Sequence, residues 1–182
     1  MTGNLWPAEH WAGGEIRVVY GLTLVALLLA LLQVGPMPRL PLLGVRPDLV
    51  FLVALAWGMV RGSAEGAVVA FSGGLALDIL SSFPLGGQAL ALLLTVISLA
   101  WLGAPFYRGN PLFPVAGAFL GTWVYHLLLL LLAQLFGQAV AWGGALRYIV
   151  LPLSLVEAAL MLPIYWLLDR LERRMHRRTR AV

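Results

Sequence analysis

Long apolar runs, separated by short segments rich in proline, glycine and arginine, dominate the sequence. A helix needs roughly 20 apolar residues to cross the hydrocarbon core of a bilayer, which is about 30 Å thick. Turn residues bound the runs: Gly35-Pro36 follows the first, and Pro111 and Pro114 precede the fifth. The pattern predicts an all-α bundle of six transmembrane helices, at residues 16–34, 47–61, 64–80, 86–104, 115–136 and 146–168.

The second and third predicted helices differ from the others in length and in glycine content. Residues 47–61 would form only about 22 Å of helix, which is shorter than the hydrocarbon core is thick. The third helix contains Gly66, Gly73 and Gly74, and such interruptions are tolerated where protein surrounds the helix. We therefore expect an inner hairpin at residues 47–80, with the first, fourth and fifth helices taking more of the lipid contact.

The composition agrees with a membrane protein. Of the 182 residues, 61% are hydrophobic and 11% are charged, whereas a soluble domain carries about a quarter charged residues. A globule of this size cannot hide so much apolar surface in one core. The composition therefore excludes a soluble enzyme, a secreted disulfide scaffold and a disordered chain. The absence of cysteine excludes thiolate chemistry, and no catalytic or metal-binding motif argues for an enzyme or a cofactor.

Arginine supplies all twelve basic residues, and half of them lie in residues 170–182. With six spans, nine arginines fall on the side of both termini and three on the other. Because cytoplasmic segments are enriched in basic residues, both termini are predicted to be cytoplasmic. Residues 1–169 would form the transmembrane domain and residues 170–182 a basic tail. The tail is either a topology anchor or a contact for anionic lipid or a partner, made by Arg170, Arg173, Arg174, Arg177 and Arg178.

Charged side chains in an apolar context are costly, so they are informative. Asp78 is in the last turn of the third helix, where a carboxylate opposes the helix dipole and needs a partner. The third helix ends on the side where the second begins, so Arg46 should lie at a similar depth. We predict an Arg46–Asp78 ion pair, or a hydrogen bond from Asp78 to the Ser81–Ser82 turn. Asp48, in the first turn of a helix, is electrostatically favoured and needs no function.

His126 and Glu157 lie near mid-membrane, at depths that differ by only about 4 Å. A histidine–carboxylate pair inside a bilayer is typical of proton relays. Since a relay needs a chain of such groups and only one pair exists, we favour one hydrogen bond satisfying each group separately. Glutamine in place of Glu157 should then leave function mostly intact.

Gly117 and Gly121 form a small-residue stripe that allows close helix packing. The stripe faces either the sixth helix or the single span of a partner, and the sequence leaves both open.

Two stretches carry a pattern that resembles the MreD family of bacterial rod shape-determining membrane proteins. One reads GVRPDLVFLV at residues 44–53, and the other reads GLALDILSSFPLGGQAL at residues 74–90. An Arg-Pro-acid entrance precedes an apolar helix, and an acid–Ser–Leu–Gly signature follows one hairpin later. Ser82 stands where many members have glycine. The matching positions are Arg46, Pro47, Asp48, Asp78, Ser81, Leu85 and Gly86.

The resemblance implies a non-enzymatic adaptor of the bacterial elongation (rod) complex that supports lateral peptidoglycan synthesis. It implies binding to the scaffold protein MreC, and association with the glycosyltransferase RodA, a class-B penicillin-binding protein and, indirectly, MreB. It also implies a fold similar to the S component of energy-coupling-factor transporters, which suggests the alternative of a small-ligand-binding transport subunit. The few, isolated intramembrane charges favour the adaptor, which would recognise its partners by shape. Nothing suggests nucleic acid as a partner.

Overall fold

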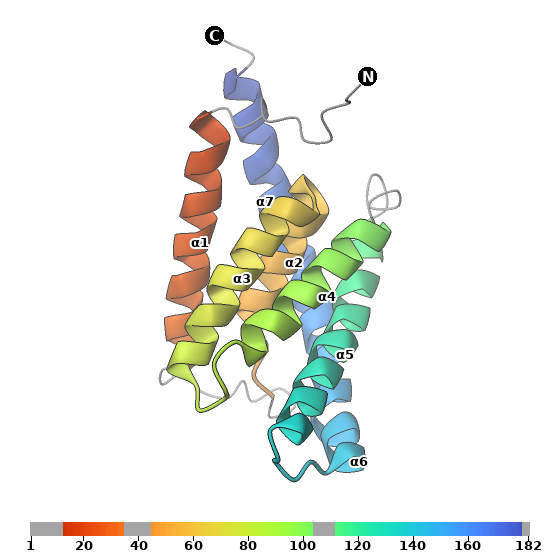
Figure 1. Ribbon diagram of the computed structural model, residues 1–182. Helices are drawn as coiled ribbons and strands as arrows, with labels where there is room; N and C mark the ends of the chain where they lie inside the picture. Colours follow the sequence, from red (N-terminus) through yellow and green to blue (C-terminus); the bar gives the residue numbers. More distant parts are fainter. Residues whose placement is uncertain (1–12, 35–44, 104–111, 180–182) are drawn as a thin grey trace, which may run out of the picture.

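A computed structural model describes residues 13–34, 45–103 and 112–179, which form an antiparallel helical bundle (Figure 1). Six helical rods cross the bundle within these ranges. The last rod is continuous but is divided by a π-helical turn, η1. The elements are α1 (Gly13–Val34), α2 (Leu49–Arg61), α3 (Ser63–Leu80), α4 (Gly87–Gly103), α5 (Leu112–Leu135), α6 (Trp142–Ala145), η1 (Leu146–Val150) and α7 (Leu151–Thr179).

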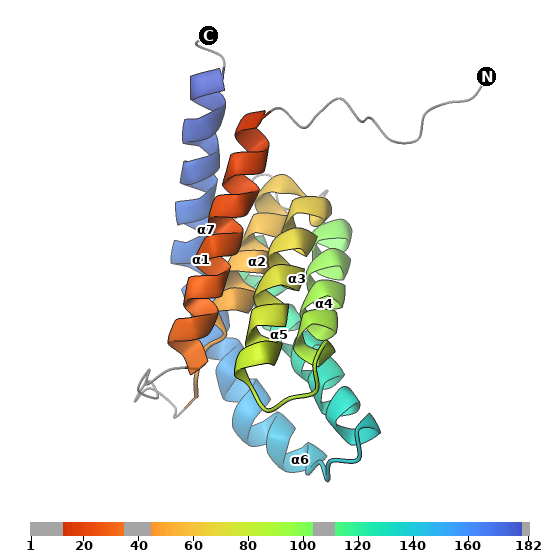
Figure 2. The same cartoon turned by 60° about the vertical axis from the view of Figure 1, so that its left-hand side comes forward.

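Each predicted segment forms a helix, and the all-α class is confirmed. Three of the helical rods are long and apolar enough to span a membrane: α3, α5 and the continuous run Trp142–Arg174. The apolar stretches within α1, α2 and α4 are shorter than those of the three rods just named. The first turn of α1 and the last turn of α7 lie at the same end of the bundle (Figures 1 and 2). We call the other end, where α6 lies, the α6 end.

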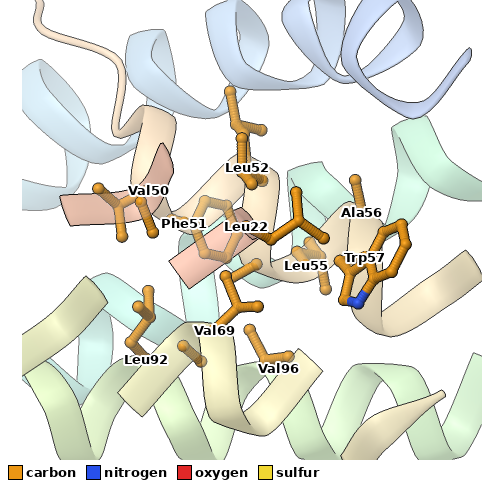
Figure 3. Close-up of a cluster of buried hydrophobic side chains, with 14 of the residues drawn as sticks. Leu22, Val50, Phe51, Leu52, Leu55, Ala56, Trp57, Val69, Leu92 and Val96 are labelled. Atoms are coloured by element: carbon orange, nitrogen blue, oxygen red, sulfur yellow. The ribbon is translucent and has the colours of Figure 1, made fainter. Parts of the chain in front are cut away.

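Helix α2 is the centre of the bundle. Every residue from Val50 to Met59 is buried, and its side chains pack against α1, α3 and α4 (Figure 3). An uninterrupted apolar sequence is what a helix enclosed on all sides requires. The predicted inner hairpin is therefore confirmed for α2. Helix α3 has one buried face and one exposed face, which carries Val68, Phe71, Leu75 and Ile79.

Glycines on α3 set its close approach to α2 and α4. A Cβ atom added at Gly66 would lie 2.5 Å from Gly58 Cα of α2. One added at Gly74 would lie 2.5 Å from Ala89 Cα of α4. No real Cβ atom tolerates such distances, so glycine at these two positions lets the helices pack backbone to backbone.

The exterior of the bundle is apolar, as a transmembrane protein requires. Large exposed apolar side chains occur on every long helix, in numbers that would form aggregation-prone patches on a soluble protein. Examples are Leu28 and Leu31 of α1, Phe71 of α3, Leu94 and Trp101 of α4, Leu120 and Leu131 of α5, and Leu155 and Leu162 of α7.

The last rod runs through two prolines and past the predicted end at residue 168. Proline lacks a backbone N–H, and the π-helical turn at Leu146–Val150 stands directly before Leu151-Pro152. Pro163 is inside the helix, as is common in membrane helices. The helix continues to Thr179, so no helix end marks the predicted boundary between residues 169 and 170. That residues 170–182 form a cytoplasmic tail stays a prediction.

Candidate functional site

Buried and half-buried polar groups gather where α2 begins, and we call Gln33, Asp48, Thr122 and Glu157 the α2 cluster. Asp48 is the N-cap of α2, because its Oδ1 accepts a hydrogen bond from the Phe51 backbone N–H at 2.9 Å. Gln33 of α1 donates to the same oxygen at 3.1 Å and accepts from the Val50 N–H at 3.1 Å. The end of α1 is thus tied to the first turn of α2.

Glu157 connects α7 to the same turn. Its side chain is fully buried, and Oε1 accepts from the Asp48 backbone N–H at 2.8 Å. Oε2 lies 2.5 Å from the Thr122 hydroxyl of α5, which also lies 2.8 Å from the Ala118 carbonyl oxygen. One carboxyl group therefore joins three helices that are distant in sequence.

His126 has a partner of its own. Its Nδ1 lies 2.9 Å from the Thr122 carbonyl oxygen, one turn earlier on α5. The imidazole ring stands edge-on to Tyr125, which stacks on Phe51 of α2 at a centroid distance of 5.6 Å. No hydrogen bond joins His126 to Glu157 in the described structure, and the two groups are satisfied separately.

Asp78, at the end of α3, caps the N-terminus of α4. Its Oδ2 accepts from the Gly86 N–H at 3.0 Å and from the Ala89 N–H at 3.1 Å, and Oδ1 accepts from the Gln88 N–H at 2.9 Å. The positive end of the α4 dipole thus compensates for the unfavourable position of the carboxylate on α3. Gly86 has a φ of +89°, which favours glycine at this turn.

The predicted Arg46–Asp78 ion pair is wrong. Arg46 is exposed just before α2, and no ion pair joins it to Asp78 in the described part of the chain. Pro47, between Arg46 and the N-cap, is buried. The predicted bond from Asp78 to the serine turn is also absent there, because the donors are backbone groups further along. Ser81 instead accepts from Gln88 Nε2 at 2.6 Å.

The glycine stripe on α5 packs inside the bundle. Gly117 and Gly121 are both buried. A Cβ atom added at Gly121 would lie 2.8 Å from side-chain atoms of Leu99 on α4 and of Phe51 on α2. Gly121 therefore packs against the central helix and α4, and not against the last rod or a partner, the two neighbours that the sequence suggested.

The end opposite α6 carries an ion network that the sequence analysis missed. Glu65 of α3 accepts from Trp57 Nε1 at 3.0 Å and pairs with Arg61 at 3.1 Å. Arg61 also lies 3.9 Å from Glu172 of α7. Arg61 and Glu65 lie on two helices that meet at Gly62, so the i, i+4 rule for a single helix does not apply, and the available signal was two opposite charges close together at a predicted turn.

The basic segment of α7 makes mostly local contacts. The Arg170 guanidinium lies 3.4 Å from the centroid of the Trp166 ring, and Arg173 pairs with Asp169 at 2.9 Å. Arg174 is exposed. The side chains of Arg177 and Arg178 lie outside the described residues.

These arrangements of polar groups stabilise the fold. Each buried carboxylate accepts hydrogen bonds from the backbone at a helix N-terminus, which is a stabilising role. Among the residues that the structure describes, no three histidine or carboxylate side chains gather where they could hold a metal ion.

The signature positions thus have defined roles: Asp48 caps α2, and Asp78 and Gly86 form the α3–α4 connection. A family model described as "rod shape-determining protein MreD" matches residues 15–174. The chain belongs to the MreD family. The match extends from the first turn of α1 into α7, which confirms the family resemblance and a role in cell shape. No curated protein and no solved structure matches the chain.

Proposed function

We propose that this MreD-family chain is a non-enzymatic membrane adaptor of the bacterial elongation (rod) complex, which binds MreC and supports lateral peptidoglycan synthesis. The family match over residues 15–174 is the observation that carries the proposal. The structure supports it in a second way. The buried carboxylates bind helix N-termini, and the surface that the bundle offers to other molecules is apolar.

The proposed topology has six passes through the inner membrane and both termini in the cytoplasm. In support, α1 begins and α7 ends at the same end of the bundle (Figures 1 and 2). The Arg61–Glu172 contact places the α2–α3 connection at that end as well. The basic segment beginning at Arg170 follows there, as the positive-inside rule requires of the cytoplasmic side.

MreC would dock through its single transmembrane span on an exposed apolar helix face. The glycine stripe at Gly117 and Gly121 is used inside the bundle, so docking falls to faces such as those of α1, α3, α4, α5 and α7. Individual contacts between membrane helices contribute at most about 1–2 kcal/mol, so many of them must add. RodA and the class-B penicillin-binding protein would assemble with this pair, and MreB indirectly.

The fold likeness to the S component of energy-coupling-factor transporters stays a prediction. A transport subunit of that kind would need a polar cavity for its ligand. The centre of this bundle is instead filled by α2, whose ten residues from Val50 to Met59 are buried among apolar neighbours. That packing favours the adaptor function.

Affinity capture with a substitution scan tests the proposal. The tagged chain is purified in mild detergent from membranes that contain MreC, and each exposed face receives one tryptophan: Leu28→Trp, Leu75→Trp, Leu94→Trp, Leu131→Trp or Leu162→Trp. We expect the unsubstituted chain to capture MreC and one face to lose capture at least tenfold. The other four variants are matched controls for folding. Absence of MreC from the unsubstituted complex, or capture that no face affects, would contradict the proposal.

A further inference from the structure

The helices of this bundle have two different apolar lengths. Asp48 and Arg61, at the two ends of α2, are thirteen positions apart, and so are Glu65 and Asp78 on α3. At 1.5 Å per residue, each stretch is about 20 Å long. On the last rod, Arg147 and Asp169 are 22 positions apart, which gives about 33 Å and matches an ordinary hydrocarbon core.

Two contacts show that the difference falls at the α6 end. Arg61 meets Glu172 at 3.9 Å, which brings α2 and α7 level at the opposite end. Asp48 meets Glu157 at 2.8 Å, and from Glu157 the last rod continues ten residues to Arg147, about 15 Å further. In Figures 1 and 2, α5, α6 and the beginning of α7 extend beyond the ends of α1–α4. We call this drop in height the step.

The two sides of the step require different surroundings. The projecting side exposes apolar residues, including Leu135, Ile149 and Leu151, which favour hydrocarbon. At the foot of the step, Arg46 is exposed and Asp48 is half-buried. A charged guanidinium at that depth favours water or a headgroup. A flat bilayer cannot satisfy both sides, which is a case of hydrophobic mismatch.

We propose that phospholipid headgroups fill the step, so that the bilayer beside α1–α4 is about 13 Å thinner at the α6 end than beside α5 and α7. Arg46 would contact a lipid phosphate there, since a guanidinium binds phosphate oxygens strongly. Lipid is the fitting occupant because the apolar lengths of α5 and the last rod already match a bilayer. The inference rests on the proposed membrane location but not on binding to MreC.

Two exposed positions at nearly the same height provide a direct test. Gly73 abuts Val50, and Ile79 lies six residues further along α3, about 6 Å beyond the level of Asp48. Leu151 lies six residues before Glu157, about 9 Å beyond the same level. In a flat bilayer, Ile79 and Leu151 would lie in the same layer because their heights are nearly equal. The step predicts that Ile79 lies among headgroups and Leu151 in hydrocarbon.

The chain has no cysteine, so Ile79→Cys and Leu151→Cys each carry a single spin label. The labelled chains are reconstituted in phosphatidylethanolamine–phosphatidylglycerol bilayers, and label depth is measured from relaxation by oxygen and by a water-soluble nickel chelate. We expect nickel to dominate at Ile79 and oxygen to dominate at Leu151. Adding Arg46→Gln should move the Ile79 label toward hydrocarbon.

Leu94→Cys, at the middle of α4, controls for membrane insertion and should give a hydrocarbon signal. Oxygen dominance at both Ile79 and Leu151 would show a flat bilayer and overturn the inference. Nickel dominance at both would show that the α5–α7 side projects into water, which also overturns it. An aqueous signal at Leu94 would instead contradict the membrane location itself. An Ile79 label that Arg46→Gln leaves in place would remove the phosphate contact from the account.

Discussion

Asp78 and Glu157 are both buried carboxylic side chains at the start of a neighbouring helix, yet their surroundings differ. Asp78 accepts hydrogen bonds from three backbone N–H groups, of Gly86, Gln88 and Ala89. Glu157 accepts from one backbone N–H, of Asp48, and its other oxygen meets the Thr122 hydroxyl.

The difference lies in the freedom of the donors. The hydrogen of a backbone N–H group has a fixed direction, so both carboxylate oxygens of Asp78 must act as acceptors. The Thr122 hydroxyl can rotate and serve as donor or acceptor. We infer that the Asp78 connection requires a carboxylate, whereas the α2 cluster requires only one acceptor and one group that can pair with a hydroxyl.

Asp78→Asn should have the largest effect. Asparagine keeps one acceptor oxygen, and its NH₂ group would face at least one backbone N–H that then lacks a partner. Leaving such buried donors unsatisfied costs about 3 kcal/mol in the free energy of unfolding. Thermal unfolding in detergent, followed by circular dichroism, would show a large drop in Tm. An unchanged Tm would contradict the assigned role of Asp78.

Gly74→Ala tests the same connection between α3 and α4, because Gly74 lets α4 approach α3 where Asp78 binds it. The added methyl group would meet the Ala89 backbone at 2.5 Å, and the helices would separate at a cost of about 2 kcal/mol. Gly21→Ala is the matched control, since nothing lies within 4 Å of its Cβ position. Equal Tm values for the two variants would show that the close approach is unimportant.

Glu157→Gln should have a small effect, below about 1 kcal/mol. The amide oxygen would accept from the Asp48 N–H, and the NH₂ group would donate to Thr122. The hydroxyl would then donate its single hydrogen to the Ala118 carbonyl, 2.8 Å away. The Tm of this variant should stay close to that of the unsubstituted chain, far above that of Asp78→Asn. A lower Tm for Glu157→Gln than for Asp78→Asn would contradict the inferred difference between the two carboxyl groups.

Arg173→Gln should have the smallest effect on Tm among these variants. Its partner, Asp169, is a carboxylate on the same helix, and 71% of the Arg173 side chain is exposed. Water replaces the arginine when the pair is broken, so exposed pairs of this kind contribute little. We expect no measurable change in Tm, and a clear drop would show that this segment packs against more than solvent.

The sequence predicts the helices well because apolar length and turn residues are local signals. The central position of α2 also follows from its short, uninterrupted apolar run after Pro47. The extent of the last helix was less predictable. The prediction carried the helix through Pro152 and Pro163 but ended it at residue 168, before the arginine-rich segment, whereas the helix runs to Thr179.

The partners of the buried acids could not be predicted in the same way. Glu157 binds the backbone of Asp48, 109 residues away, and backbone donors leave no mark in the sequence. Charge complementarity suggested Arg46 for Asp78, but three N–H groups satisfy that carboxylate without a cation. Gln33 and Thr122, two members of the α2 cluster, are uncharged residues in apolar helices and gave no stronger signal than many others.

Complementation of cell shape tests the central claim most directly. The chain is expressed in a rod-shaped bacterium from which the resident MreD protein has been depleted, and cell width and length are measured by microscopy. We predict that the unsubstituted chain and Glu157→Gln restore rods, whereas Asp78→Asn leaves round cells. Round cells with the unsubstituted chain, although it is present in the membrane together with MreC, would contradict the proposal that this bundle is an adaptor for wall elongation.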